Sequence, residues 1–255
     1  MKWALITGAS SGLGRDFALL LAARGYALLL TARREGHLLK VREECLQAGS
    51  SEVQIFPGDL GDEVFRQGLI GKARELKLEI LINNAGFGDF GFFHESEWPR
   101  QQEMLRLNIE ALTHLCHALI PHLLNQSCSC LLNIASVAAF QPGPGMSVYF
   151  ASKAFVLHFS EALAEELSET SLRVCCLCPG TTRTEFFDAA GMGHVLRASP
   201  SMDSLSVAKA GLDAMFGGRR VHVPGILNRI LSLASRFFPR RFTAWLSGKI
   251  LFRRM

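Results

Sequence analysis

The strongest constraint on the fold is a regular alternation of short apolar runs with longer segments of helical period. Apolar strands that alternate with amphipathic helices are typical of a parallel sheet with right-handed crossovers and helices on both faces. The predicted strands are 3–7, 27–32, 53–56, 79–83, 130–136, 172–178 and 220–223, and the predicted helices are 13–24, 35–48, 62–77, 97–125, 150–169 and 203–216.

The composition is that of a folded chain with a large core. Of its 255 residues, 49% are apolar and 20% are charged, and no repeat, low-complexity tract or Pro/Gly-rich linker divides the strand series. We therefore expect one α/β domain over residues 1–255, built on a doubly wound seven-stranded parallel sheet. Residues 225–255 are expected to be a basic, helical C-terminal extension of that domain.

The seven cysteines are an odd number at irregular spacings, which does not fit a disulfide framework. Cys175 and Cys178 have the spacing of a redox or metal pair, but their apolar, strand-like surroundings favour buried thiols, and we expect no metal site. The apolar run before the first glycines is too short for a signal peptide or a membrane span. These features predict an intracellular, cytoplasmic protein.

The first predicted strand is followed by the glycine-rich stretch TGASSGLG. Glycines allow a tight turn and a close approach of the backbone to phosphate, and the helix that follows offers unpaired N–H groups and a partial positive charge. A plain glycine-rich turn is the alternative, but the strand–turn–helix setting favours a pyrophosphate site. The expected contacts are Gly8, Ser10, Ser11, Gly12, Leu13 and Gly14.

The end of the second predicted strand bears on the choice of dinucleotide. An acid at this position would bind a ribose 2′-hydroxyl, but here Ala32 is followed by Arg33 and Arg34. Guanidinium groups pair well with phosphate, so we predict NADP(H) rather than NAD(H). The alternative is that both arginines are solvated residues at the start of a helix.

Tyr149 and Lys153 lie four positions apart, on one face of a helix. Alone, this pair fits a decorated surface helix as well as a phenol with an ammonium beside it to move its proton. The surrounding motifs favour the second interpretation, because the sequence resembles the short-chain dehydrogenase/reductases over its first 220 residues or so. The matching motifs are TGASSGLG, GDL at 58–60, NNAG at 83–86, Asn108, Ser136, YFASK at 149–153 and PGTTRT at 179–184.

The resemblance implies a Rossmann-like fold and an NADP(H)-dependent carbonyl reductase or alcohol dehydrogenase with four catalytic residues. Tyr149 would transfer the proton, and Lys153 would bind the nicotinamide ribose. The positive charges of Lys153 and of the oxidised nicotinamide would lower the pKa of Tyr149. Ser136 would hydrogen-bond the carbonyl oxygen. Asn108 would bend the long helix and hold a water leading to Lys153.

The resemblance also implies cofactor contacts at the ends of later strands. Asp59, next to Leu60, would bind the adenine amino group, unless it merely caps a helix. Asn84, Ala85 and Gly86 would line the adenosine ribose, with a simple turn at Asn84 as the alternative. Thr184 would fix the carboxamide together with Pro179, Gly180 and Thr182, or would cap the next helix. Many NADP-preferring relatives carry Lys or Arg in the glycine loop. Ser10 and Ser11 stand there in this chain, so Arg33 and Arg34 are the expected phosphate partners.

Two loops that border the active-site cleft in relatives are rich in aromatic residues. An apolar wall suits a hydrophobic carbonyl or alcohol substrate, although these side chains could instead pack on the core or on another subunit. Because relatives are often dimers or tetramers, a homo-oligomer is expected. The residues concerned are Phe87, Phe90, Phe92, Phe93 and Trp98, followed by the segment 185–196.

Residues 214–255 contain eight Arg, one Lys and no acid, whereas the rest of the chain is net acidic. Apolar residues recur at helical spacing, and Pro239 separates two predicted short helices. Segment 226–255 is expected to form a lid over the cleft or a subunit interface, with peripheral membrane contact as the alternative. We expect no nucleic-acid binding, because the arginines accompany apolar faces. A non-catalytic NADPH-binding scaffold is disfavoured, because a scaffold has no need of Ser136, Tyr149 and Lys153.

Overall fold

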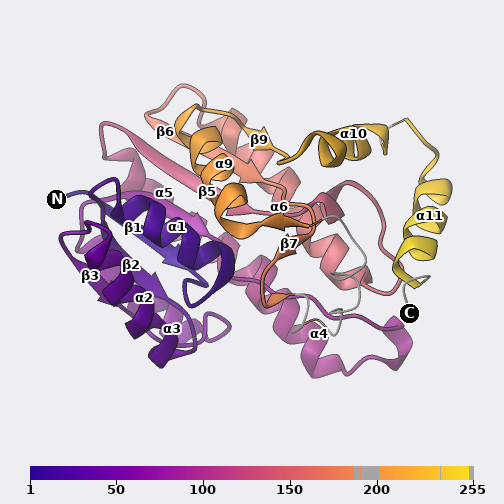
Figure 1. Cartoon of the computed structure of the whole chain (residues 1–255), viewed down its shortest axis with the longest axis horizontal. Coiled ribbons are helices and arrows are strands. Elements are labelled where there is room, and N and C mark those ends of the chain that lie inside the picture. Colours follow the sequence, from indigo (N-terminus) through magenta and orange to yellow (C-terminus); the bar gives the residue numbers. More distant parts are fainter. Residues whose placement is uncertain (187–189, 191–200, 236, 253–255) are drawn as a thin grey trace.

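Seven parallel strands form the central sheet of the structure, a computed structural model that describes residues 1–186, 190, 201–235 and 237–252 (Figure 1). The strand order is β3-β2-β1-β4-β5-β6-β9, so the chain builds one half of the sheet outward from β1 and then the other half outward from β4. This confirms the predicted seven-stranded parallel sheet. The strands are β1 (Trp3–Thr7), β2 (Ala27–Thr31), β3 (Val53–Ile55), β4 (Leu78–Asn83), β5 (Ser129–Ile134), β6 (Leu172–Leu177) and β9 (Val221–His222).

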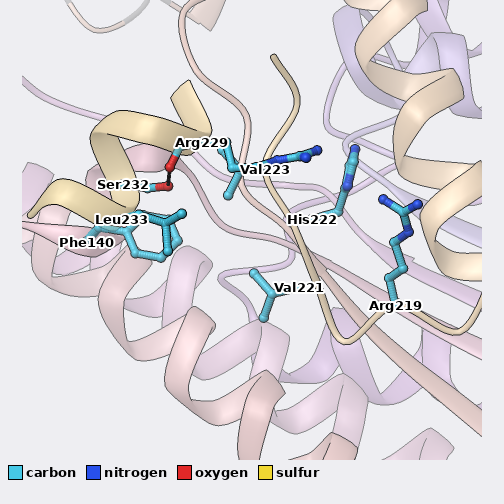
Figure 2. Close-up of a pocket in the computed structure, with 8 residues that line it drawn as sticks. All are labelled: Phe140, Arg219, Val221, His222, Val223, Arg229, Ser232 and Leu233. Carbon is cyan, nitrogen blue, oxygen red and sulfur yellow. Dashed lines mark hydrogen bonds between the residues drawn. The ribbon is translucent and has the colours of Figure 1, made fainter. Parts of the chain in front are cut away.

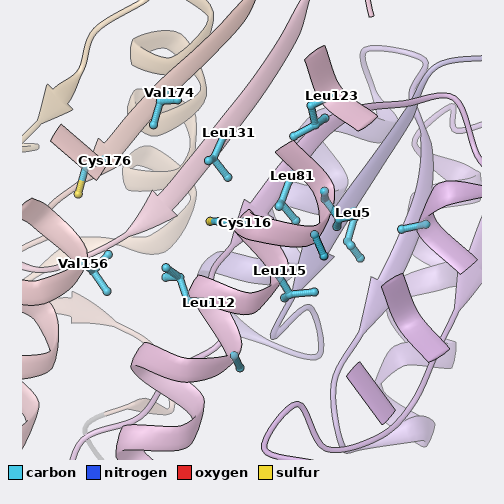
Figure 3. Close-up of a cluster of buried hydrophobic side chains, with 14 of the residues drawn as sticks. Leu5, Leu81, Leu112, Leu115, Cys116, Leu123, Leu131, Val156, Val174 and Cys176 are labelled. Atoms are coloured by element: carbon cyan, nitrogen blue, oxygen red, sulfur yellow. The ribbon is translucent and has the colours of Figure 1, made fainter. Parts of the chain in front are cut away.

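Helices cover both faces of the sheet, because successive side chains of each strand point to opposite faces. In β1, Ala4 and Ile6 pack against α1 (Gly12–Ala22), α2 (Glu35–Gln47) and α9 (Ser204–Phe216). The alternate residues Trp3 and Leu5 pack against α3 (Glu63–Arg74), α5 (Leu112–Leu124) and α6 (Ser147–Glu166). Figure 3 shows the core on the face covered by α3, α5 and α6, in which leucines of α5 contact Leu5, Leu81 and Leu131 of the sheet.

The long predicted helix 97–125 is divided into three parts. It consists of α4 (Trp98–Leu105), a π-helical turn (Arg106–Ala111) and α5. The π-helical turn holds one extra residue, and Asn108 within it is 1% exposed. The distortion expected at Asn108 is therefore present.

Other element boundaries differ modestly from the prediction. Helix α6 begins at Ser147 rather than at 150, so Tyr149 lies in its first turn. A small two-stranded sheet of β7 (Thr182–Arg183) and β8 (Met202–Asp203) was not expected, because runs of two residues have no readable periodicity. The extension forms α10 (Ile226–Ala234) and α11 (Arg240–Phe252), which confirms the two short helices on either side of Pro239.

All seven cysteines are free thiols, and all except Cys128 are buried. Burial raises the pKa of Cys45, Cys116, Cys130 and Cys175 to about 12. Cys175 and Cys178 are therefore buried thiols on and beside β6, as their apolar setting predicted.

Candidate active site

The glycine turn between β1 and α1 is closed so tightly that it leaves no room for side chains. Gly8 and Gly12 adopt left-handed backbone conformations, with φ of +66° and +53°. A Cβ atom at Gly14 would lie 2.2 Å from the carbonyl oxygen of Gly8. The turn therefore requires glycine at these positions, and it leads into the N-terminus of α1, where the N–H groups of the first turn have no intrahelical partner.

The loop after β4 is tied to this glycine turn. The side-chain amide of Asn84 donates hydrogen bonds to the carbonyl oxygens of Thr7 (2.9 Å) and Gly8 (3.2 Å). In return, Thr7 Oγ1 accepts from the N–H groups of Asn84 and Ala85, both at 3.0 Å. The structure therefore brings the NNAG loop to the predicted phosphate turn, with Asn84 holding the two together.

Arg34 extends over the glycine turn. Its Nη2 donates to Ser11 Oγ at 2.9 Å and to Ser10 Oγ at 3.3 Å, and it forms an ion pair with Glu185 Oε2 at 2.7 Å. Ser11 Oγ donates to the same carboxylate at 3.0 Å. These hydrogen bonds from Arg34 and Ser11 lower the pKa of Glu185.

Arg33 is also ion-paired, with Glu103 of α4 at 2.9 Å. Arg34 therefore contacts the glycine turn and Arg33 contacts α4, and each is held by a carboxylate that sequence reasoning missed. No local signal could have revealed Glu103 and Glu185, which stand 70 and 151 residues from their arginine partners.

Asp59 organises the loop after β3. Its Oδ1 accepts a hydrogen bond from the N–H of Gly61 at 2.8 Å, while the residue as a whole is exposed and Leu60 beside it is buried. The carboxylate therefore stabilises a local turn rather than capping a helix; Asp62 caps α3 instead. The contact of Asp59 with adenine remains a prediction.

Tyr149, Lys153 and Ser136 meet where β5 ends and α6 begins. Lys153 Nζ lies 5.9 Å from the centre of the Tyr149 ring and donates to the carbonyl oxygen of Ile134 at 2.8 Å. Ser136 Oγ accepts from the N–H of Ala138 at 3.1 Å and donates weakly to the carbonyl oxygen of Pro179 at 3.4 Å. The structure thus brings the three predicted catalytic side chains together.

Burial dominates the electrostatics of Tyr149 and Lys153. Burial raises the pKa of Tyr149 to about 12, opposed in part by a hydrogen bond with Ser136. Burial also lowers the pKa of Lys153 to about 8, although Cys176 and Cys178 oppose that shift. Without nucleotide, burial therefore outweighs the hydrogen bond from Ser136, and the lowering expected with the oxidised nicotinamide bound remains a prediction.

Asn108 positions the loop after β4 against α6. Its Oδ1 accepts from the N–H of Phe87 at 3.1 Å, and its Nδ2 donates to the carbonyl oxygen of Phe87 at 2.9 Å and to Ser152 Oγ at 3.1 Å. Ser152 in turn donates to the carbonyl oxygen of Tyr149 at 2.7 Å. Sequence reasoning missed Ser152, although its place directly before Lys153 was a usable signal.

The loop after β4 is packed closely between the side chains of Asn108 and Lys153. A Cβ atom at Gly86 would lie 2.9 Å from Asn108 Oδ1 and 3.4 Å from Lys153 Nζ. The water that Asn108 was expected to hold remains a prediction.

We predict that the burial of Lys153 makes stability depend on pH. Its folded-state pKa of about 8 lies below the ordinary 10.5, so between these values the unfolded chain binds more protons and stability rises with pH. Lys153→Met, which buries no charge, should therefore be the more stable protein at pH 8. Its advantage should shrink by up to about 3 kcal/mol as the pH approaches 10.5.

Urea unfolding of both proteins without nucleotide, under reducing conditions, measures this difference. Lys40→Met, at an exposed position on α2, is the matched control and should show no such trend. A pH-independent difference for Lys153→Met would show that the ammonium is not desolvated.

Apolar side chains surround Tyr149, but only part of the predicted aromatic wall belongs to them. Phe87 packs near Tyr149 together with Met104, Met146 and Phe150, and the ring of Phe186 lies 5.3 Å from the Tyr149 ring. Phe186 belongs to segment 185–196, of which residues 187–189 and 191–196 lie outside the described part of the chain.

Of the other predicted wall residues, Phe90 packs against the same cluster and the rest lie farther out. Phe90 and Phe92 pack on Phe252 of α11, at 5.6 and 4.9 Å between ring centres, whereas Phe93 and Trp98 are mostly exposed. The sequence left open whether these aromatic residues pack on another element. Phe90 and Phe92 do so, because they contact α11.

The loop after β6 approaches the site from the other side. Thr184 lies over the glycine turn, with its Cγ2 atom 3.0 Å from where a Cβ of Gly12 would stand. Thr182 Oγ1 donates to the carbonyl oxygen of Gly180 at 3.0 Å, and Asn228 of α10 packs directly on Gly180. Thr184 Oγ1 accepts a long hydrogen bond from the N–H of Phe186 at 3.4 Å, and this bond closes a local turn.

A separate cavity of about 250 Å³ lies between β9, α10 and Phe140 (Figure 2). The residues predicted to be catalytic do not line it. Its lining combines basic and apolar side chains: Phe140, Arg219, Val221, His222, Val223, Arg229, Ser232 and Leu233.

Comparison with known proteins identifies the family. The family model described as short chain dehydrogenase matches residues 2–192. The chain belongs to this family. It is therefore an NAD(P)-dependent oxidoreductase that acts on an alcohol or a carbonyl compound.

Three solved structures illustrate its relatives. A Sphingobium yanoikuyae short-chain dehydrogenase in complex with NADPH is 32% identical, with a TM-score of 0.85 over 93% of this chain and 94% of that one. A Burkholderia phymatum short-chain dehydrogenase/reductase in complex with NAD is 27% identical, with a TM-score of 0.83 over 91% and 92%. The bulky-bulky ketone specific alcohol dehydrogenase from Comamonas testosteroni is 28% identical, with a TM-score of 0.80 over 93% and 92%.

The residues present fit a dinucleotide. The space beside Gly8 and Gly14 admits no Cβ atom, and Arg34 and Ser11 offer donors at the edge of the same turn. Such a cradle is where a family dinucleotide would place its phosphates.

Proposed function

We propose that the chain is an NADP(H)-dependent reductase of hydrophobic carbonyl compounds that uses Tyr149 as its proton donor. The observation that carries the proposal is the grouping of buried Tyr149 and Lys153 with Ser136 beside an apolar cluster, at the carboxyl edge of the sheet where the glycine turn also lies. The same residues would run the reaction in reverse, from alcohol to carbonyl.

The nicotinamide of the bound cofactor supplies the hydride. The rest of the chemistry belongs to side chains. Ser136 Oγ would donate a hydrogen bond to the carbonyl oxygen, where negative charge grows as hydride arrives at carbon. The buried Tyr149 hydroxyl, protonated at neutral pH because its pKa is about 12, would transfer its proton to that oxygen.

Lys153 would stabilise the phenolate left on Tyr149. Its ammonium lies on the same helical face, and its pKa of about 8 keeps it largely charged at neutral pH. It would also bind the ribose hydroxyls of the cofactor. Asn108, held by Phe87 and Ser152, would keep the loop at Gly86 in place and carry the water between solvent and Lys153.

The remaining cofactor contacts are proposed as the motifs predict them. Arg33 and Arg34 would bind the 2′-phosphate, exchanging their carboxylate partners for it. Asp59 and Leu60 would hold the adenine, and Asn84, Ala85 and Gly86 the adenosine ribose. Pro179, Gly180, Thr182 and Thr184 would fix the carboxamide. The turn contacts would be Gly8, Ser10, Ser11, Gly12, Leu13 and Gly14.

The substrate class follows from the surroundings of Tyr149. Phe186, Phe87 and Met146 leave apolar surface beside the proton donor, which suits a bulky hydrophobic ketone. The resemblance to a bulky-ketone alcohol dehydrogenase supports this class.

We expect NADPH oxidation to rise with the apolar size of the ketone. A series of aliphatic and aromatic ketones, followed by absorbance of NADPH, measures the trend in kcat/KM. Each added methylene that is buried should raise kcat/KM by up to about fourfold until the cleft is filled. Tight NADPH binding without turnover of any ketone would favour a cofactor-binding scaffold instead.

We also propose that the chain forms a homo-oligomer, a dimer or tetramer, through its long helices. Phe155 on α6 is 38% exposed and stacks on Phe159 at 5.7 Å, which leaves an aromatic pair on the outer side of that helix. Light scattering during gel filtration measures the mass, and a monomer at micromolar concentration would contradict the proposal.

A further inference from the structure

The two C-terminal helices contact the body of the protein mainly through small and polar residues, together with Leu251 and Phe252 at the end of α11. In α10, Ser232 is the buried residue and Asn228 packs on Gly180. In α11, the buried residues are Ser247 and Gly248, and a Cβ atom at Gly248 would lie 3.3 Å from Pro144. An ordinary surface helix buries its large apolar residues instead.

Most of the large apolar side chains of these helices and of the turn between them are exposed to solvent. Ile226 is 78% exposed and Phe237 is 86% exposed. Large apolar residues that gather, exposed, on one segment of a monomer mark an interaction site. We name these exposed side chains the outer face, which consists of Ile226, Leu227, Ile230, Leu231, Phe237, Phe238, Phe242, Trp245, Leu246 and Ile250.

The outer face is set in strongly positive surroundings. Residues 214–255 carry eight Arg and one Lys without any Asp or Glu. Arg219 and Arg229 line the cavity beside α10 together with His222, and within the described part of the chain neither arginine forms an ion pair (Figure 2). Burial and these two arginines lower the pKa of His222, as expected where positive charge is not neutralised.

The sign of this charge argues against a second copy of the chain as the occupant. A two-fold dimer brings the same patch of both subunits together, so it would set one arginine-rich face against another. A bilayer of anionic lipid matches both properties, because its headgroups are negative and its interior is apolar. The helices lie at the end of the molecule opposite β2, β3 and α2 (Figure 1), and the side chains of the outer face are exposed there.

We propose that the outer face binds an anionic lipid surface and lies in its interface. Within the described residues, no helix is long and apolar enough to cross a membrane, so the attachment is peripheral. Lys249, which lies 4.3 Å above the Trp245 ring, is placed to meet headgroups while that ring enters the interface.

Vesicle flotation tests the proposal with the full chain. Vesicles of phosphatidylcholine mixed with phosphatidylglycerol should bind the protein, and pure phosphatidylcholine vesicles should bind at least about tenfold less. About 0.5 M salt should weaken the binding several-fold, because it screens the attraction of the arginines. Absence of flotation with the anionic vesicles would overturn the proposal.

Two variants distinguish vesicle binding by the outer face from non-specific adsorption of the protein to vesicles. Leu227→Glu combined with Ile230→Glu should reduce vesicle affinity by about tenfold or more, because it removes apolar area and adds negative charge. Val64→Glu is the matched control: Val64 is 80% exposed on α3, outside the outer face, and its replacement should leave binding unchanged. Equal losses in both variants would contradict the proposal. Circular dichroism and turnover of a water-soluble ketone verify that the variants are folded.

The fluorescence of Trp245 reports directly on contact between the outer face and the vesicle. In a Trp98→Phe background the remaining tryptophans are Trp245 and the buried Trp3, so a blue shift of emission on adding anionic vesicles reports Trp245 entering the interface. If Leu227→Glu with Ile230→Glu instead halves the mass in solution while emission is unaffected by vesicles, the outer face binds a second copy and the lipid proposal fails.

Discussion

Replacing Tyr149 by phenylalanine is expected to lower kcat for ketone reduction by about a thousandfold or more. The hydroxyl lies in a buried apolar cluster, and general acid catalysis by a positioned group contributes about 10²–10⁴-fold. The Kd for NADPH should change by less than about threefold, because the ring and its packing are retained. Steady-state kinetics and fluorescence titration with NADPH measure the two quantities separately.

The sequence offers a matched control for this substitution. The chain has two tyrosines, and Tyr26 lies at the start of β2, far from Ser136 and Lys153 in the strand order. Tyr26→Phe should retain wild-type turnover. If Tyr149→Phe kept more than about a tenth of kcat, the proton would have to come from another group and the proposed mechanism would be wrong.

The second large effect concerns the choice of cofactor. Arg34→Gln is expected to raise the Kd for NADPH by about tenfold while leaving the Kd for NADH nearly unchanged. A hydrogen bond to a charged group is worth about 1.5–3 kcal/mol, and the lower end applies because the Arg34 side chain is 45% exposed. Titration of each variant with both nucleotides measures the preference.

Glu185 sharpens this test, because it competes with phosphate for Arg34 in the protein without nucleotide. Glu185→Gln should therefore tighten NADPH binding several-fold and leave NADH binding unaltered. Arg24→Gln is the matched control, since Arg24 is an exposed arginine in a 3.4 Å ion pair with Asp213 away from the glycine turn. Equal weakening of NADH and NADPH by Arg34→Gln would mean that Arg34 does not read the 2′-phosphate.

Much of the fold was predictable because its determinants are local in the chain. A strand such as 27–32 is apolar at every position except Thr31, which is typical of a parallel sheet covered on both faces, and the apolar residues of the helices between strands repeat every 3.6 residues. The glycine turn and the Tyr149–Lys153 pair were readable for the same reason, since each depends on spacing within one turn or one helix.

Other features depend on contacts between distant segments, and no local pattern carries them. Which acids hold Arg33 and Arg34 was decided by the approach of α4 and of the segment after β7. The pKa of Tyr149 was decided by how completely the surrounding elements exclude water, which outweighs the hydrogen bond with Ser136.

The C-terminal helices show the division most clearly. Their apolar spacing and positive charge are written in the sequence, and both predicted helices are present. Amphipathic spacing shows only that a helix has an apolar and a polar face. It does not show which of the two faces packs against the rest of the protein. The tertiary structure decided that, because the small residues Ser232, Ser247 and Gly248 allow close packing against the body and leave most of the large apolar side chains outside.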